Sequence, residues 1–334
     1  MNLSNFFNSY MGMYIAQAFS HSLIAALVVD RAIHAWNITN PVVKQRFSLI
    51  VMIFPIFSFP LYQVVNPERG SPFFRLDTLF DINRWLNIEL WGKVPLTLLF
   101  ILMLAGAAMI FFVQEMIPLV RHLLESKKFR SEEDDGKEKT HDNPAIDKVL
   151  RDFPGEKPHI SLIDDDDFII YSTTGKDPAI FLSTGLINTL NTDEIEAAVA
   201  HELAHIKRSK RPLLVLAYII RILMFFNPVV LVEFRRIVQE EEKICDDIAV
   251  SLTRKHSALA ETLKKFSHKR EEIKLDRVKD LSTLGSSLED YSHSVHMENR
   301  IKRLDAGWSL PAGGEWMKFL LTLSAITAMN YFVV

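Results

Sequence analysis

The sequence contains a single cysteine, Cys245, among its 334 residues. One thiol cannot build an internal disulfide framework, and it excludes a zinc site made of several cysteines. Net charge is also small, because 38 basic and 41 acidic side chains leave a formal charge of -3. This balance gives no support to a nucleic-acid partner. The N-terminus has no charged region before its first apolar run, so we expect that run to remain as a membrane anchor.

Apolar residues, in contrast, are abundant. They make up 49% of the chain, although charged residues still account for 24%. Such a mixture is typical of membrane segments joined to a hydrophilic domain. We therefore predict an integral membrane protein, mainly α with a small β-sheet. Four runs are about long enough to cross a lipid bilayer, namely residues 10–29, 47–65, 95–113 and 316–334.

The short loops between these runs predict the orientation. Basic residues follow the first and third runs, with Arg31, Lys44 and Arg46 in one loop. Loops rich in Lys and Arg stay on the cytoplasmic side, which puts both termini outside. The loop at 66–94 has balanced charge and many aromatic residues, so we expect it to lie in the outer membrane interface.

His21 lies within the first apolar run. An ionisable residue in a span is a candidate proton or ligand site. Hydrogen bonding to a neighbouring helix is the simpler role, and it is the one we expect.

The residues at 192–207, TDEIEAAVAHELAHIK, predict a helix, because capping residues and early acids precede an uninterrupted run. This helix carries an H-E-x-x-H motif, His201-Glu202-Leu203-Ala204-His205. Histidines four apart share one helix face, so both imidazoles can reach one zinc ion. Glu202 is the candidate general base that takes a proton from the attacking water.

A catalytic zinc ion needs a third protein ligand. Glu242 and Asp246 are four residues apart, so the glutamate can bind the metal while the aspartate holds a histidine by its other ring nitrogen. Glu241 is a rival ligand, because it lies nearer the centre of the apolar helical stripe. Cys245, between the two acids, is expected to be a small packing residue.

The apolar stretch at 212–232 constrains this metal site. A single membrane crossing would leave Glu242 on the opposite side from His201. The helix-breaking pair Asn227-Pro228 offers a solution, because it divides 212–242 into two arms of about 22 Å each. We therefore predict a re-entrant hairpin over 212–242.

Short β-type runs follow residue 158: HISLI, FIIYSTT and AIFLST. A strand among residues 178–183 is a candidate edge for pairing with an extended substrate. The predicted domains are a membrane domain at 1–125, a charged flexible linker at 126–145, a peptidase domain at 146–306 that includes the hairpin, and the last span at 316–334.

Four segments together resemble the BlaR/MecR sensor-transducer family of membrane zinc peptidases, which are gluzincins. The segments are STGLINTLNTDEIEAAVAHELAHIK at 183–207, NPVV at 227–230, EKICDDIAV at 242–250 and ENRIKRL at 298–304. The family's antibiotic-sensing receptors continue into an extracellular penicillin-binding domain. This sequence does not contain that domain, so we do not expect direct β-lactam sensing.

The resemblance implies a gluzincin-type α+β domain with zinc held by His201, His205 and Glu242. It also implies Glu202 as general base and Asp246 as partner of a zinc-binding histidine. The implied location is the cytoplasmic membrane of a prokaryote, with the active site facing the cytoplasm, and the family also suggests a homodimer. Candidate donors to the oxyanion, with the last two ranked first, are Tyr171, His293, His296 and Arg300.

The predicted function is zinc-dependent cleavage of a protein substrate at the cytoplasmic side of the membrane, in signalling or regulation. A repressor, the protein's own linker and membrane proteins are all candidate substrates. A CAAX-prenyl-protease or HtpX-like quality-control peptidase is the alternative among enzymes. A non-catalytic membrane transducer with a structural zinc site is the alternative from another class.

Overall fold

The computed structural model describes residues 6–7, 9–76, 78–117, 144–153, 157–174, 177–209, 212–277, 296–307 and 315–334. Most of the predicted linker at 126–145 lies outside these residues. The chain divides into two compact units. The first unit consists of Met1–Asp134, Leu213–Glu240 and Pro311–Val334, and the second of Asp135–Pro212 and Glu241–Leu310.

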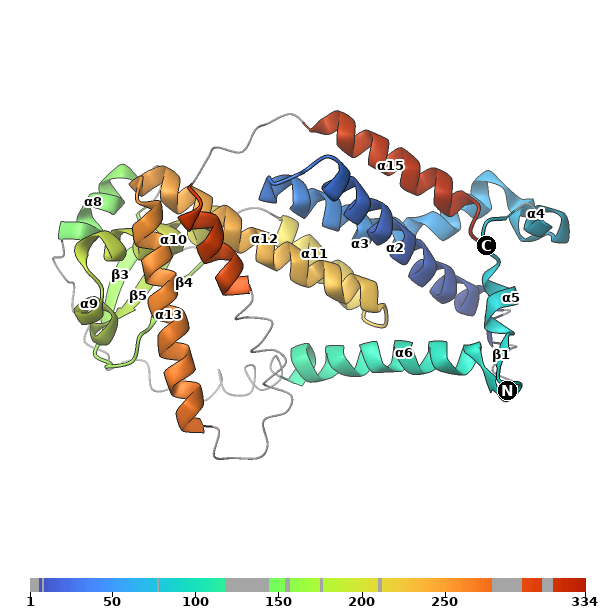
Figure 1. Ribbon diagram of the computed structural model, residues 1–334, viewed down its shortest axis with the longest axis horizontal. Coiled ribbons are helices and arrows are strands. Elements are labelled where there is room, and N and C mark those ends of the chain that lie inside the picture. Colours follow the sequence, from blue (N-terminus) through green and yellow to red (C-terminus); the bar gives the residue numbers. More distant parts are fainter. Residues whose placement is uncertain are drawn as a thin grey trace. The chain divides into compact units, whose positions relative to one another are not determined.

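Long apolar helices dominate the first unit. Three are long and apolar enough to cross a membrane, and they coincide with the first three predicted spans: Tyr10–Ala35, Pro41–Val65 and Leu96–Gln114. They correspond to α2 (Tyr10–Ala35), α3 (Pro41–Val65) and α6 (Leu96–Phe111) with the π-helical turn η2 (Phe112–Met116). The last helix, α15 (Trp316–Tyr331), has 16 residues and lies beside α2 and α3 (Figure 1). It is shorter than these three, so its crossing stays a prediction.

The segment between α3 and α6 is built from short elements. These are η1 (Pro67–Gly70), α4 (Pro72–Leu76), α5 (Ile82–Leu86) and the two-residue strands β1 (Glu89–Leu90) and β2 (Val94–Pro95). Phe73 and Trp91 are 83% and 88% exposed. Large exposed aromatic side chains suit a membrane interface, which remains the predicted place of this segment.

A cluster of buried polar groups lies inside the first unit. His21 Nδ1 is 2.7 Å from Ser58 Oγ on α3, which confirms the predicted hydrogen bond to a neighbouring helix. The fully buried Arg69 donates to Gln17 Oε1 at 3.2 Å and to the carbonyl oxygens of Asn330 and Tyr331 at 2.9 and 3.0 Å. We call this group, His21 with Arg69 and their partners, the Arg69 cluster.

The predicted break at Asn227-Pro228 is confirmed. Helix α11 (Leu213–Leu223) ends before it and α12 (Pro228–Thr253) begins there, with Asn227 Oδ1 accepting from the Val229 amide at 3.0 Å. The rings of Tyr218 and Phe234 lie 6.1 Å apart across the hairpin. Residues Leu213–Glu240 belong to the first unit, whereas we predicted them within the peptidase domain. The reason is their apolar faces, which pack with side chains of α2 and α3.

The second unit contains a three-stranded sheet in the order β3-β5-β4. The strands are β3 (His159–Ile163), β4 (Ile170–Thr173) and β5 (Ala179–Ser183), and they match the three predicted β-type runs. Strand β5 pairs in parallel with β3 and antiparallel with β4. The prediction of a free edge among residues 178–183 is therefore wrong, because both sides of β5 are already paired. The edges are β3 and β4.

Helices complete the second unit around an apolar core. They are α8 (Pro144–Asp152), α9 (Thr184–Thr189), α10 (Thr192–Ser209), α13 (His256–Arg277), the second half of α12, and the helical residues 296–305. Helix α10 packs against α8, α13 and β4. Its Val199 and Leu203 are fully buried in the core together with Ile180 and Leu182 of β5. The motif helix is thus held on several sides.

Candidate metal centre

The sequence fixes the start of the motif helix α10 locally. Asn191 Oδ1 accepts from the Glu194 amide at 3.0 Å, and Glu194 Oε2 accepts from the Asn191 amide at 2.9 Å. This reciprocal capping box satisfies two backbone donors that the helix itself leaves unpaired. With the start fixed and no glycine or proline following, the helix runs to Ser209 and carries both motif histidines on one face.

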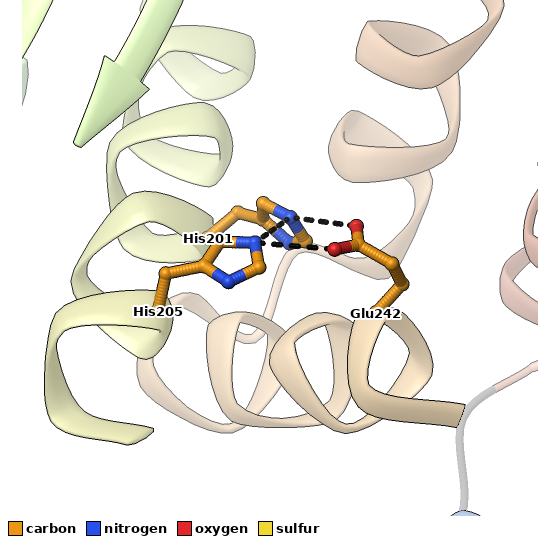
Figure 2. A group of neighbouring side chains, drawn as sticks. All are labelled: His201, His205 and Glu242. Atoms are coloured by element: carbon orange, nitrogen blue, oxygen red, sulfur yellow. Dashed lines mark hydrogen bonds and ion pairs between the residues drawn. The ribbon is translucent and has the colours of Figure 1, made fainter. Parts of the chain in front are cut away.

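The structure brings the three predicted zinc ligands together (Figure 2). His201 Nε2 is 3.1 Å from His205 Nε2, and each of these atoms is 3.6 Å from an oxygen of Glu242. Ligands about 2.0–2.1 Å from a tetrahedral zinc ion stand about 3.3 Å from one another. The two imidazole nitrogens and the Glu242 carboxylate, whose two oxygens each lie 3.6 Å from one of them, form a donor set that suits a zinc ion.

Glu241, the rival ligand, is occupied elsewhere. Its carboxylate pairs through both oxygens with Arg208 in the last turn of α10, with an Nη2 to Oε2 distance of 2.6 Å. Both side chains are buried. The apolar stripe on the helical wheel did mark Glu241 as inward-facing, but the group that it meets is a guanidinium. Among the described residues, Glu242 is therefore the acid that joins His201 and His205.

Asp246 and Arg300 contact the predicted ligands His201 and Glu242. Asp246 Oδ1 lies 3.1 Å from His201 Nδ1, the ring nitrogen opposite the one that faces Glu242. Arg300 donates from Nε and Nη2 to the two oxygens of Asp246, at 2.8 and 2.7 Å, and its Nη1 lies 2.9 Å from Glu242. All three guanidinium nitrogens thus contact acids of the site.

The electrostatics of this group favour a cation. Burial alone would lower the pKa of His201, but hydrogen bonding to Asp246 and Glu242 outweighs it and raises that pKa to about 9. Burial works against the charge of Glu242 as well, yet His201 and Arg300 lower its pKa to about 2. Burial and the charge of His201 together lower the pKa of His205.

Counting charges leads to the same conclusion. The carboxylates of Glu202, Glu242 and Asp246 surround the histidines, and Arg300 is the guanidinium that contacts two of them. When both histidines are neutral, these three carboxylates and one guanidinium leave two negative charges in excess. A divalent cation would balance them. The donor set and the charge therefore both fit a zinc ion.

Two further residues contact the H-E-x-x-H motif in the folded structure, although their positions in the sequence do not indicate it. Ser172 on β4 donates from Oγ to Glu202 Oε2 at 2.7 Å. Ser172 was not among the predicted site residues, and no motif marks it. Only the alternation of side chains along β4 could have indicated that it points inward. Cys245 is fully buried with Sγ 3.5 Å from His205 Nδ1. Burial and the charge of Glu242 raise the pKa of its thiol, which keeps it a neutral packing group.

The predicted oxyanion donors are differently placed. Tyr171 is 44% exposed and stacks on Phe181, while the adjacent Ser172 faces Glu202. His296 is half-buried in the first turn of the helical residues 296–305. His293 lies outside the described residues. Arg300 is at the site, where its nitrogens contact Asp246 and Glu242.

A family model described as BlaR1 peptidase M56 matches residues 91–280, a range that includes the motif helix and α12. No curated protein and no solved structure matches the chain.

Proposed function

The chain belongs to the M56 peptidase family, whose members are metallopeptidases, and from this membership we propose that it is a membrane-bound, zinc-dependent endopeptidase of the gluzincin type. The observation that carries the proposal is the cluster of His201, His205 and Glu242 at zinc-ligand spacing, with Glu202 beside it. The family match supports the peptidase activity, and the donor set supports zinc as the metal.

Three side chains would hold the metal and one would move the proton. His201, His205 and Glu242 are the proposed ligands, and a bound zinc ion would act as a Lewis acid on the peptide carbonyl. Glu202 takes a proton from the attacking water and later gives it to the leaving amine. Asp246 Oδ1 lies 3.1 Å from Nδ1 of His201, so we propose that it holds this side of the ring and leaves Nε2 directed to the ligand group.

Arg300 fits a positioning role better than the oxyanion role that we predicted for it. Its three nitrogens are engaged with Asp246 and Glu242, so it holds the third ligand and the partner of His201 in one arrangement. His296 remains the candidate donor to the oxyanion.

We propose that the substrate is a protein, and that an extended segment of it pairs with the edge strand β4. This strand carries Ser172, which contacts Glu202.

The proposed setting is the cytoplasmic membrane of a prokaryote, with the site facing the cytoplasm. Three helices able to span a membrane support the membrane setting, and the basic loops after the first and third spans support the orientation. Signalling or regulation by cleavage of a repressor or a membrane protein, and assembly as a homodimer, complete the proposal.

The Glu202→Gln variant tests the proposal. The amide cannot accept the proton, so cleavage should fall by about 10³-fold while zinc content remains that of the wild type. Purified full-length protein in detergent gives the zinc content, and native membranes allow the variant to trap uncleaved substrate. An unchanged cellular function in this variant would instead favour a non-catalytic transducer.

A further inference from the structure

The hydroxyl of Ser172 is the closest polar partner described for the general base. Its Oγ donates to Glu202 Oε2 at 2.7 Å, and Glu202 itself is buried. An ionised carboxylate only accepts hydrogen bonds, so the serine must be the donor. A hydrogen bond to a charged acceptor is about twice as strong as one between neutral groups.

The backbone of Ser172 is itself well fixed. Strand β4 pairs antiparallel with β5, with Ser172 opposite Ile180, and Ile180 is fully buried in the core of the unit. The neighbouring Tyr171 and Thr173 are exposed, whereas Ser172 is partly buried, because side chains alternate along a strand. Ser172 therefore offers its hydroxyl to α10 from a rigid support.

Glu202 differs from the other acids of the site in the kind of partner it has. Glu241, Glu242 and Asp246 are each contacted by a guanidinium. Among the described residues, no ion pair involves Glu202, and its partner is a neutral hydroxyl. A neutral donor restrains the carboxylate without cancelling the charge that proton abstraction requires.

We propose that Ser172 is a positioning residue that holds the Glu202 carboxylate in one orientation, with Oε2 bound to the serine and Oε1 left for the attacking water. The inference rests on the proposed function for its catalytic consequence. The contact itself can be tested without catalysis.

The catalytic consequence is tested with fluorescein-labelled casein as a general, disordered substrate of the full chain. Ser172→Ala should lower kcat by about tenfold, because the base is no longer held in place, with KM changed less than about twofold. Ser172→Thr keeps the hydroxyl and should restore most of the loss. Ser161→Ala, the same change on the other edge strand β3, is the matched control and should keep the wild-type kcat. Zinc content should be unchanged in all three variants.

The contact is tested by thermal unfolding of the metal-free full chain in detergent. Ser172→Ala should lower the unfolding midpoint by about 3 °C in the wild-type background and by less than about 1 °C in the Glu202→Ala background. An equal shift in both backgrounds, or a wild-type kcat in Ser172→Ala, would overturn the inference. If the zinc-loaded wild type leaves casein intact, that result counts against the proposed function, and the unfolding comparison alone then decides the role of Ser172.

Discussion

Each unit of the molecule places a histidine of low exposure near an arginine, but the partners of the two pairs differ. In the Arg69 cluster, the guanidinium donates to an amide oxygen and to backbone carbonyls, and His21 contacts Ser58 and the carbonyl of Val333. At the candidate metal centre, Arg300 and His201 both contact carboxylates.

This difference decides which cluster can bind a metal. Neutral carbonyls can satisfy a buried guanidinium, but they leave no negative charge to attract a second cation. The candidate metal centre has more carboxylates than guanidinium groups, and its two imidazole Nε2 atoms lie close together. A buried histidine is thus a poor indicator of a metal site by itself, and its acidic partners are the informative part.

The adjacent acids of α12 provide the test with the largest expected effect. Glu242→Gln replaces the proposed third ligand and should lower zinc affinity on the order of 10³-fold or more, as measured by competition with a chelator. Glu241→Gln should leave zinc affinity within about tenfold but lower the free energy of unfolding by about 3 kcal/mol, since buried Arg208 loses its counter-charge. The reverse pattern would make Glu241 the third ligand.

The pH dependence of zinc binding should be almost as large. The raised pKa of His201, about 9 in the metal-free protein, means that zinc must displace a proton at neutral pH. Zinc affinity should therefore rise about tenfold per pH unit between pH 6 and pH 8, or about 100-fold in all, after correction for the chelator. If zinc affinity stops rising above pH 7, the pKa of His201 is that of an ordinary histidine. That result would contradict the expected effect of Asp246 and Glu242 on this pKa.

A smaller loss of zinc affinity is expected from a change at Asp246, which contacts the other ring nitrogen of His201. Asp246→Asn removes the acceptor of His201 Nδ1 and one partner of Arg300, and should lower zinc affinity by about 30-fold. Asp247→Asn is the matched control, because Asp247 pairs with Arg303. It should change the affinity by less than about threefold. Similar losses in both variants would mean that general charge, and not the contact with His201, controls binding.

The Arg69 cluster should have the smallest effect on zinc. Arg69→Met leaves several buried carbonyl oxygens without their donor, so the unfolding midpoint should fall by about 5 °C. Zinc affinity should be unchanged, because Arg69 and the neutral acceptors that it has among the described residues all belong to the first unit, which does not contain the predicted ligands. A loss of zinc in this variant would erase the contrast between the two clusters.

The sequence predicted those features that local chemistry determines. The capping box at Asn191 and the uninterrupted run after it fix α10, and Asn227-Pro228 ends α11. The β-type runs likewise became strands. These signals act over a few residues, so they can be read without knowing what packs against them.

What the sequence could not predict depends on residues far apart in the chain. Arg208 lies 33 residues before Glu241, and no helical wheel shows that it neutralises this acid. The parallel pairing of β3 with β5 makes β4 an edge, although β4 lies between them in sequence. Ser172 reaches Glu202 only because of this strand order. Sheet order and ion-pair partners are tertiary facts.

The pairing of Arg208 with Glu241 has a consequence for how the protein would gain and lose the proposed zinc ion. Successive residues of a helix point about 100° apart, so an arginine that grips one residue also sets the angle of the next. The contact between Arg208 and Glu241 thus helps to set the direction of Glu242, and a bound ion would not touch it. We therefore expect the binding site to keep its structure when zinc is removed. Addition of zinc should then restore binding without a refolding step.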